Sequence, residues 1–97
     1  MSRSLIERRL TDVHVRLQKA REELAVIDEQ LDVLADHAEQ ARLRSLVSET
    51  PLANKEYTEA QRHADAMART RRTVAASIDE LQLAQDELLD RLVTESH

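Results

Sequence analysis

Apolar residues recur along the chain in two long stripes, each with alternating spacings of three and four residues. A repeat of this kind averages 3.5 residues and keeps one side of an α-helix turned toward a partner helix. The pattern predicts an all-α fold, an antiparallel two-helix coiled-coil hairpin that dimerises into a four-helix bundle. We call the two stripes the seam. Its members are Ile6, Leu10, Val13, Leu17, Ala20, Leu24, Ile27, Leu31, Leu34, Ala38, Ala41 and Ser45 in the first stripe and Tyr57, Ala60, Ala64, Met67, Arg71, Val74, Ile78, Leu81, Gln85, Leu88 and Leu92 in the second.

The first helix is expected to span about residues 4–49. Ser4 and Glu7 have the spacing of a capping box, in which each side chain satisfies a backbone N–H group at the start of a helix. Pro51 disfavours helical backbone at the residue before it, so the helix should end by Glu49.

Two residues are candidates for the N-cap of the second helix. Thr50 would place Pro51 in the first turn, where proline is favoured, whereas Asn54 would start the helix four residues later. The gap between the two stripes of the seam is centred near residue 52, which favours Asn54. We therefore expect a loop of about residues 50–55, a second helix of about residues 55–94, and a single helical-hairpin domain over residues 1–97.

Register and charge both favour a hairpin over an extended rod. Pairing residues whose numbers sum to 105 sets a positions against d positions, with Leu17 opposite Leu88 and Ala41 opposite Ala64. The net charges of residues 1–21, 22–39, 40–73 and 74–97 are +4, −7, +3 and −5. Folding the chain back sets opposite signs beside each other, whereas a parallel dimer would stack the acidic blocks.

Two residues of the seam are polar. In the expected register Arg71 faces Leu34 and Gln85 faces Ala20. We interpret both as specificity residues, because a polar group in a coiled-coil seam lowers stability but fixes register and oligomeric state. The alternative for Arg71 is a functional one, in which its guanidinium holds an anionic ligand or the carboxylate of a partner.

Further apolar residues lie outside the seam, where water is expected. Grouped apolar residues on outer faces indicate a second buried surface, and we predict self-association into a homodimer. A second group lies near the loop and is a candidate docking site for another protein. The candidate interface comprises Val26, Val33, Leu83, Leu89 and Val93, and the candidate loop-end docking site comprises Leu43, Leu46, Val47 and Leu52.

The residues offer no recognisable reaction chemistry. The chain has no cysteine and no glycine, and therefore no thiolate metal site and no glycine-rich phosphate loop. Glu59 and His63 share a helix face but supply only two metal ligands, and neither a His-Glu-x-x-His nor a Glu-x-x-His motif is present. We expect no catalytic residues, no metal site and no cofactor, and hence no enzyme.

Composition limits the remaining functions. No apolar run is long enough for a membrane span, and the N-terminus has no signal-peptide pattern, so a cytoplasmic protein is expected. The bias toward Ala, Arg, Leu, Asp and Glu resembles that of a high-GC bacterial genome, so we expect a bacterial source. The net charge of −5 and the single aromatic residue disfavour nucleic-acid binding. We expect a non-enzymatic protein–protein interaction or scaffold module. The alternative is a transcription-associated regulator that binds RNA polymerase, a sigma factor or nucleic acid through its basic and apolar loop end.

Overall fold

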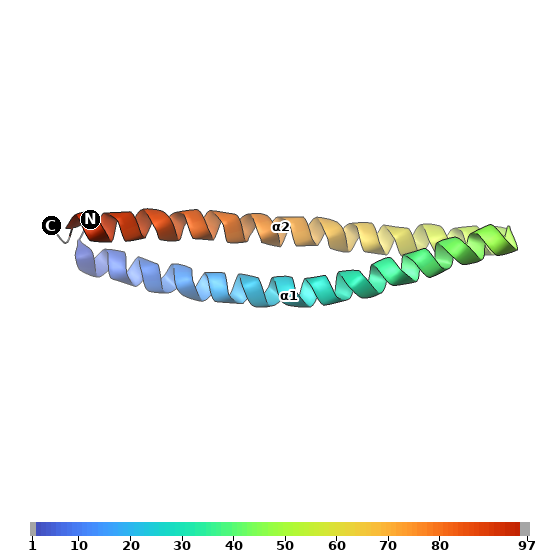
Figure 1. Ribbon diagram of the computed structural model, residues 1–97, viewed down its shortest axis with the longest axis horizontal. Helices are drawn as coiled ribbons and strands as arrows, with labels where there is room; N and C mark the ends of the chain where they lie inside the picture. Colours follow the sequence, from blue (N-terminus) through green and yellow to red (C-terminus); the bar gives the residue numbers. More distant parts are fainter. Residues whose placement is uncertain (1, 96–97) are drawn as a thin grey trace. The chain divides into compact units, whose positions relative to one another are not determined.

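The computed structural model describes residues 2–95 as two long helices that pack together as a hairpin (Figure 1). Helix α1 spans Arg3–Ser48 and helix α2 spans Pro51–Glu95. Within the described range only Ser2, Glu49 and Thr50 lie outside these helices, and no strand is present. The prediction of an all-α hairpin of two helices is confirmed.

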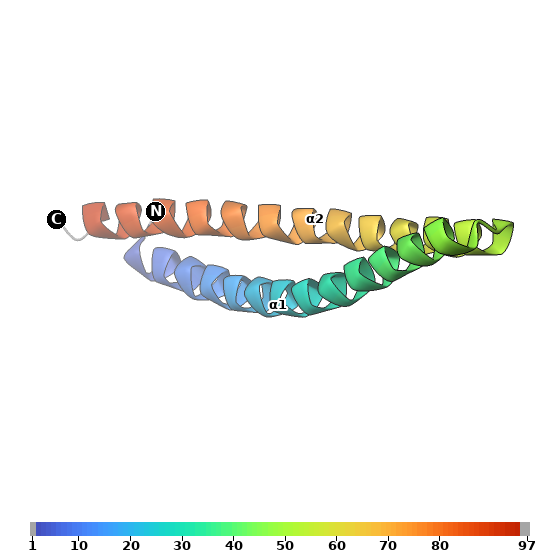
Figure 2. The same ribbon diagram turned by 45° about the vertical axis from the view of Figure 1, so that its right-hand side comes forward.

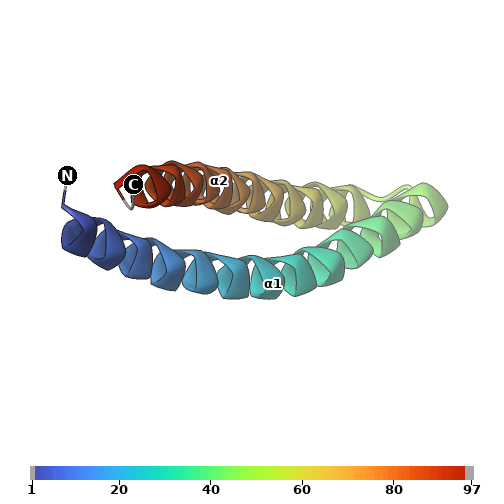
Figure 3. The ribbon, with the colours of Figure 1, turned by 60° about the vertical axis from the view of Figure 1, so that its left-hand side comes forward.

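The chain forms two compact units, each built from a part of both helices. Unit one joins α1 up to Leu24 with α2 from Thr73 onward. Its two helical segments run without interruption (Figure 3). Unit two comprises Ala25–Arg72 and contains the turn between the helices (Figure 2).

The seam supplies the buried surface of both units. Every seam residue is buried or half-buried, and most of the remaining described residues are exposed. Ile6 and Leu17 are the largest side chains that are almost fully buried. Towards the turn the buried positions carry small side chains, which are Ala38, Ala41, Ser45, Ala53 and Ala64. The 3.5-residue spacing therefore identifies the apolar contact between the helices correctly.

The turn is shorter than expected and its N-cap is Thr50 rather than Asn54. The Thr50 hydroxyl accepts a hydrogen bond from the Ala53 N–H at 3.1 Å, and Pro51 takes the first helical position. The Asn54 N–H already donates to the Thr50 carbonyl at 3.0 Å, within the first turn of α2. A threonine N-cap followed by proline at the first helical position is enough to start a helix. The gap between the two stripes of the seam therefore predicted the wrong first residue for the second helix.

Glu49 closes the C-terminus of α1 in the left-handed region, with φ of 51°. Its N–H donates to the Ser45 carbonyl at 3.0 Å, the single bond of an αL C-cap. Glycine usually takes this position, but the chain contains none. A side chain in this conformation costs about 1–2 kcal/mol, which the adjoining caps and packing offset.

Ser2, not Ser4, caps helix α1. The Ser2 hydroxyl accepts from the Leu5 N–H at 3.3 Å, and the Ser2 carbonyl accepts from the Ile6 N–H at 3.0 Å. Ser4 lies inside the helix, and Glu7 pairs with Arg3 instead of returning to a cap. Both Ser2 and Ser4 have the side chain that an N-cap needs, and the capping-box spacing predicted the wrong one.

The two-residue turn shifts the expected register by about one heptad. In unit two, Arg71 lies 20 residues after Pro51 and Asp28 lies 20 residues before Ser48, so the two are level. Their side chains are in contact, and Leu34 lies about 9 Å nearer the turn at 1.5 Å per residue. In unit one, Val13 shares a pocket with Ala84 and Leu88, which places Gln85 near Val13 rather than Ala20. Residues that lie opposite each other in the two helices therefore have numbers that sum to about 98, instead of the expected 105.

Candidate interaction surfaces

Val26 and Val33 lie on the exposed side of α1 in unit two. Val26 is 53% exposed and Val33 69% exposed, and they are seven residues apart on the same face. Val33 borders a shallow, mostly apolar hollow of about 400 Å³ that Glu29, Gln30 and Leu34 complete. An aliphatic side chain beside a hollow of this kind is a suitable contact for another apolar side chain.

Leu83, Leu89 and Val93 belong to α2 in unit one, and all three are exposed. Acidic side chains surround them in sequence, among them Asp86 and Asp90. The structure therefore leaves all five residues of the candidate interface accessible, divided between the two units. Their role in dimerisation stays a prediction.

The candidate loop-end residues gather around the turn of unit two. Val47 is 87% exposed, and Leu43, Leu46 and Leu52 are exposed as well. The capped ends of α1 and α2 hold these side chains close to the turn, since only two residues separate the helices. Arg44 and Lys55 give the surroundings a basic character, and the described chain supplies no ion pair to either. The turn end therefore combines exposed aliphatic side chains with two basic side chains that form no ion pair within the described residues.

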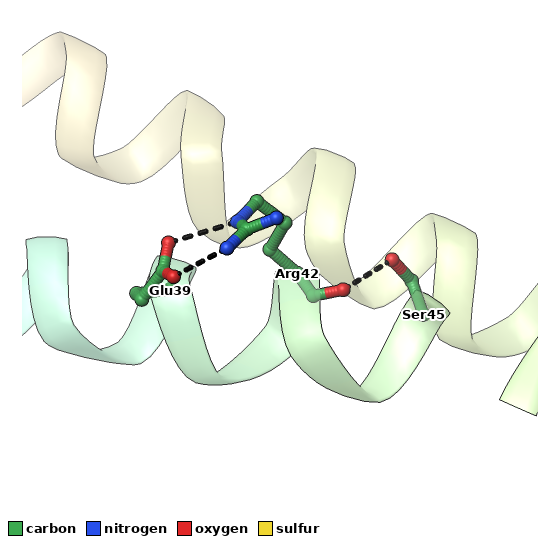
Figure 4. Close-up of polar contacts among 3 residues, drawn as sticks. All are labelled: Glu39, Arg42 and Ser45. Atoms are coloured by element: carbon green, nitrogen blue, oxygen red, sulfur yellow. Dashed lines mark hydrogen bonds and ion pairs between the residues drawn. The ribbon is translucent and has the colours of Figure 1, made fainter. Parts of the chain in front are cut away.

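Arg42 forms a two-point ion pair on the surface of α1. Its Nε donates to Glu39 Oε2 at 2.9 Å and its Nη2 donates to Glu39 Oε1 at 2.6 Å (Figure 4). The hydrogen bond to Arg42 lowers the pKa of Glu39, so the pair is lost only as the pH falls through that lowered value. In the same turn, the buried Ser45 hydroxyl donates to the Arg42 carbonyl at 2.7 Å. Arg42 is thus engaged within its own helix, which the composition of the basic half did not reveal.

Arg71 crosses between the helices and binds Asp28. Arg71 Nε and Asp28 Oδ1 are 2.5 Å apart, and both side chains are about half exposed. The hydrogen bond from Arg71 to Asp28, followed by the Coulombic attraction between them, raises the pKa of Arg71. Sequence reasoning placed Arg71 opposite Leu34, and the shorter turn places it beside an acidic residue instead. The described chain itself provides a carboxylate for Arg71, so this ion pair needs neither an anionic ligand nor a partner protein.

Asp28→Ala removes the carboxylate that pairs with Arg71, and is expected to lower the melting temperature by a few degrees because the Arg71 guanidinium then lies unpaired at the seam. Adding Arg71→Leu to Asp28→Ala should restore or exceed the wild-type melting temperature, because an apolar side chain suits the seam. Thermal unfolding by circular dichroism measures both variants. Asp32→Ala is the matched control, since Asp32 is exposed on the same helix and forms no ion pair within residues 2–95. Equal melting temperatures for Asp28→Ala and Asp32→Ala would show that the pair contributes nothing.

Gln85 is half-buried in unit one, and no side-chain hydrogen bond from it is present within the described residues. Partial burial leaves part of this residue in contact with water. The specificity role of Gln85 stays a prediction.

A pocket of about 290 Å³ opens between α1 and α2 in unit two. Two histidines and two carboxylates meet there, including the predicted pair of Glu59 and His63. Within residues 2–95, however, no three His, Asp or Glu side chains converge tightly enough to hold a metal ion. The lining residues are Leu34, His37, Arg44, Glu56, Glu59, Ala60 and His63.

None of the described helices combines the length and apolar character that crossing a lipid bilayer requires. No protein-family model matches the chain, and neither a curated protein nor a solved structure matches it. Any functional assignment therefore depends on the surfaces themselves.

Proposed function

We propose that the protein is a non-enzymatic interaction or scaffold module built on an antiparallel coiled-coil hairpin, which associates with a second copy into a four-helix assembly. The observation that carries the proposal is the set of large aliphatic side chains left accessible on both helices. Val26, Val33, Leu83, Leu89 and Val93 are each between 45% and 69% exposed. Large aliphatic side chains that group on an outer face are typical of surfaces that a partner covers.

The heptad spacing supports the coiled-coil part of this proposal. Every seam residue is buried or half-buried, whereas most of the positions between them are exposed. Interlocking packing of a and d residues produces this division along both helices. The Arg71–Asp28 pair adds a polar contact of the kind that discriminates between registers.

Sedimentation velocity at micromolar concentration tests the self-association. The wild-type chain is expected to sediment as a dimer, and the variant with Val33→Glu and Leu89→Glu as a helical monomer, because a buried unpaired carboxylate opposes association. Gln18→Glu with Gln82→Glu is the matched control, since it adds two carboxylates at exposed polar positions. A wild-type chain that remains monomeric at high concentration would contradict the proposal.

A second candidate function is favoured by the turn end. Leu43, Leu46, Val47 and Leu52 surround a two-residue turn beside Arg44 and Lys55, and this surface suits a regulator that contacts transcription proteins or nucleic acid. The engagement of Arg42 and Arg71 in ion pairs reduces the positive charge that such a regulator would offer to phosphates. Binding to DNA across a salt series, and partner capture with and without nuclease, distinguish this candidate from a scaffold module.

A further inference from the structure

Within unit two, the side of α1 that faces away from the seam is acidic. Residues 25–41 contain five acidic residues and neither lysine nor arginine. One of them, Asp28, is bound to Arg71. The other four are exposed and follow one another at spacings of three and four residues, so they share one helical face with Val26 and Val33. We call this face the acidic edge, and it comprises Val26, Glu29, Asp32, Val33, Asp36 and Glu39.

The side of α2 that faces away from the seam in unit two is predominantly basic. Its exposed positions, reached from Lys55 by steps of three and four residues, carry four basic and two acidic side chains, a net charge of +2. One of the two carboxylates, that of Asp65, already accepts a hydrogen bond from the Gln61 amide at 2.9 Å. We call this face the basic edge, and it comprises Lys55, Thr58, Glu59, Arg62, Asp65, Arg69 and Arg72.

Several of these charges have no partner in their own chain. Within residues 2–95, Glu29 and Asp32 of the acidic edge form no side-chain hydrogen bond and no ion pair. The same holds for Arg62 and Arg72 of the basic edge. Each edge of unit two therefore keeps charge that the described part of the chain leaves unpaired, and the two edges are opposite in sign.

We infer that the acidic edge of one copy docks on the basic edge of a second copy. The inference rests on the proposed self-association and names the surfaces that meet, both of which lie within unit two. The four carboxylates of the acidic edge meet a face on which basic groups outnumber acidic ones, and complementary charge of this kind selects the partner. Contact between two acidic edges would instead oppose four carboxylates to four others, and like charges at an interface disfavour association.

The spacing of the charges also matches across the two edges. Glu29 and Asp36 are seven residues apart on α1, and Arg62 and Arg69 are seven residues apart on α2, which is about 10 Å along each helix axis. One placement of the helices can therefore pair both carboxylates with both guanidinium groups. Asp36 accepts a hydrogen bond from the Gln40 amide at 3.0 Å, which leaves its negative charge unneutralised.

A shallow hollow on the basic edge can receive an aliphatic side chain between the paired charges. Its volume is about 400 Å³, and Arg62 and Arg69 both border it. Val33 lies between Glu29 and Asp36 in the sequence of α1 and is 69% exposed, so a placement that pairs the charges brings Val33 over the hollow. The methylene groups of the arginines then cover the valine. The lining residues are Tyr57, Thr58, Gln61, Arg62, Asp65 and Arg69.

The two edges belong to different helices, so the contact between them is heterologous. Two chains joined in this way leave one acidic edge and one basic edge open. Further copies can add through the same contact, because nothing in its symmetry closes the assembly after two chains. The average mass in solution should therefore continue to rise above that of a dimer as the protein concentration increases.

Two variants that each neutralise one edge test the inference by sedimentation equilibrium. Glu29→Gln with Asp36→Asn leaves the basic edge intact, and Arg62→Gln with Arg69→Gln leaves the acidic edge intact. Each variant alone lacks one side of the contact, so its dissociation constant should rise by about 30-fold or more. An equimolar mixture should form a 1:1 complex about as tightly as two wild-type chains, because the two intact edges meet. That complex should not grow further, since the edges left open are the neutralised ones.

Two matched controls change the net charge equally at exposed positions outside both edges. They are Glu23→Gln with Glu56→Gln and Arg8→Gln with Lys19→Gln, and each should leave the dissociation constant within about threefold of the wild type. If the wild type self-associates but the edge variants associate equally well, or if their mixture stays monomeric, this inference is overturned while self-association stands. A wild type whose mass stops at that of a dimer at every concentration also overturns it. A wild type that remains monomeric overturns the proposed function as well.

Discussion

A chain with Ala38→Cys and Ala60→Cys is expected to close an intramolecular disulfide almost completely under mild oxidation. Ala38 lies 10 residues before Ser48, and Ala60 lies nine residues after Pro51, so the two are level across the seam of unit two. Both carry small side chains, which lets the backbones approach to the distance that a disulfide requires. Mass spectrometry and non-reducing gel electrophoresis measure the extent of closure.

The matched control is the pair Ala41→Cys and Ala64→Cys, which the longer loop predicted from the sequence would have brought together. With the two-residue turn, these positions are offset by about 9 Å along the helix axes. Cα atoms more than about 7 Å apart are not bridged without backbone movement, so this pair should remain largely reduced. Efficient closure of the control pair alone would restore the register with a sum of 105. Crosslinks that form only between chains would contradict the hairpin itself.

Leu17→Ala is expected to lower the free energy of unfolding by about 2–4 kcal/mol. Leu17 is 1% exposed in the seam of unit one, so truncation removes buried apolar surface and leaves a cavity. For a chain of this length the change corresponds to a fall in melting temperature of roughly 10 °C or more. Urea unfolding followed by far-ultraviolet circular dichroism gives the free energy directly.

Leu46→Ala provides the same chemical change at a residue that is 60% exposed. It should alter the free energy of unfolding by less than about 0.5 kcal/mol, because little buried surface is lost and alanine favours the helix. Similar effects of the two substitutions would mean that the seam is not the main apolar contact of the fold.

The seam was predictable from the sequence because the spacing of the apolar residues determines which side chains face the other helix and become buried. Side chains every 3.5 residues form one stripe, and one stripe is what a partner helix can cover. Two helices with the same seven-residue repeat match equally well after a slip of one heptad, however. The register therefore depends on the length of the turn. The Ala53 N–H donates to the Thr50 hydroxyl and α2 begins at Pro51, so the turn is shorter than the gap between the two stripes of the seam suggests.

The polar contacts were less predictable for the same reason. Pairing Arg71 with Asp28 requires the correct register, whereas the pair of Glu39 and Arg42 needs only the i,i+3 spacing within one helix. That spacing was present in the sequence and could have been recognised. The aliphatic residues of the candidate interface were grouped from the sequence because they lie outside the seam, and each of them is exposed in the structure.

Tyr57 gives the protein a built-in spectroscopic reporter. It is the only aromatic residue in the chain, and it is half-buried in unit two, near Arg42. Its fluorescence and near-ultraviolet dichroism therefore report on the packing of that unit alone, without a label and without overlap from a second chromophore. Far-ultraviolet dichroism, in contrast, averages over both helices. The two signals recorded on one sample thus compare the unfolding of unit two with that of the whole chain, and coincident curves would indicate a single cooperative transition.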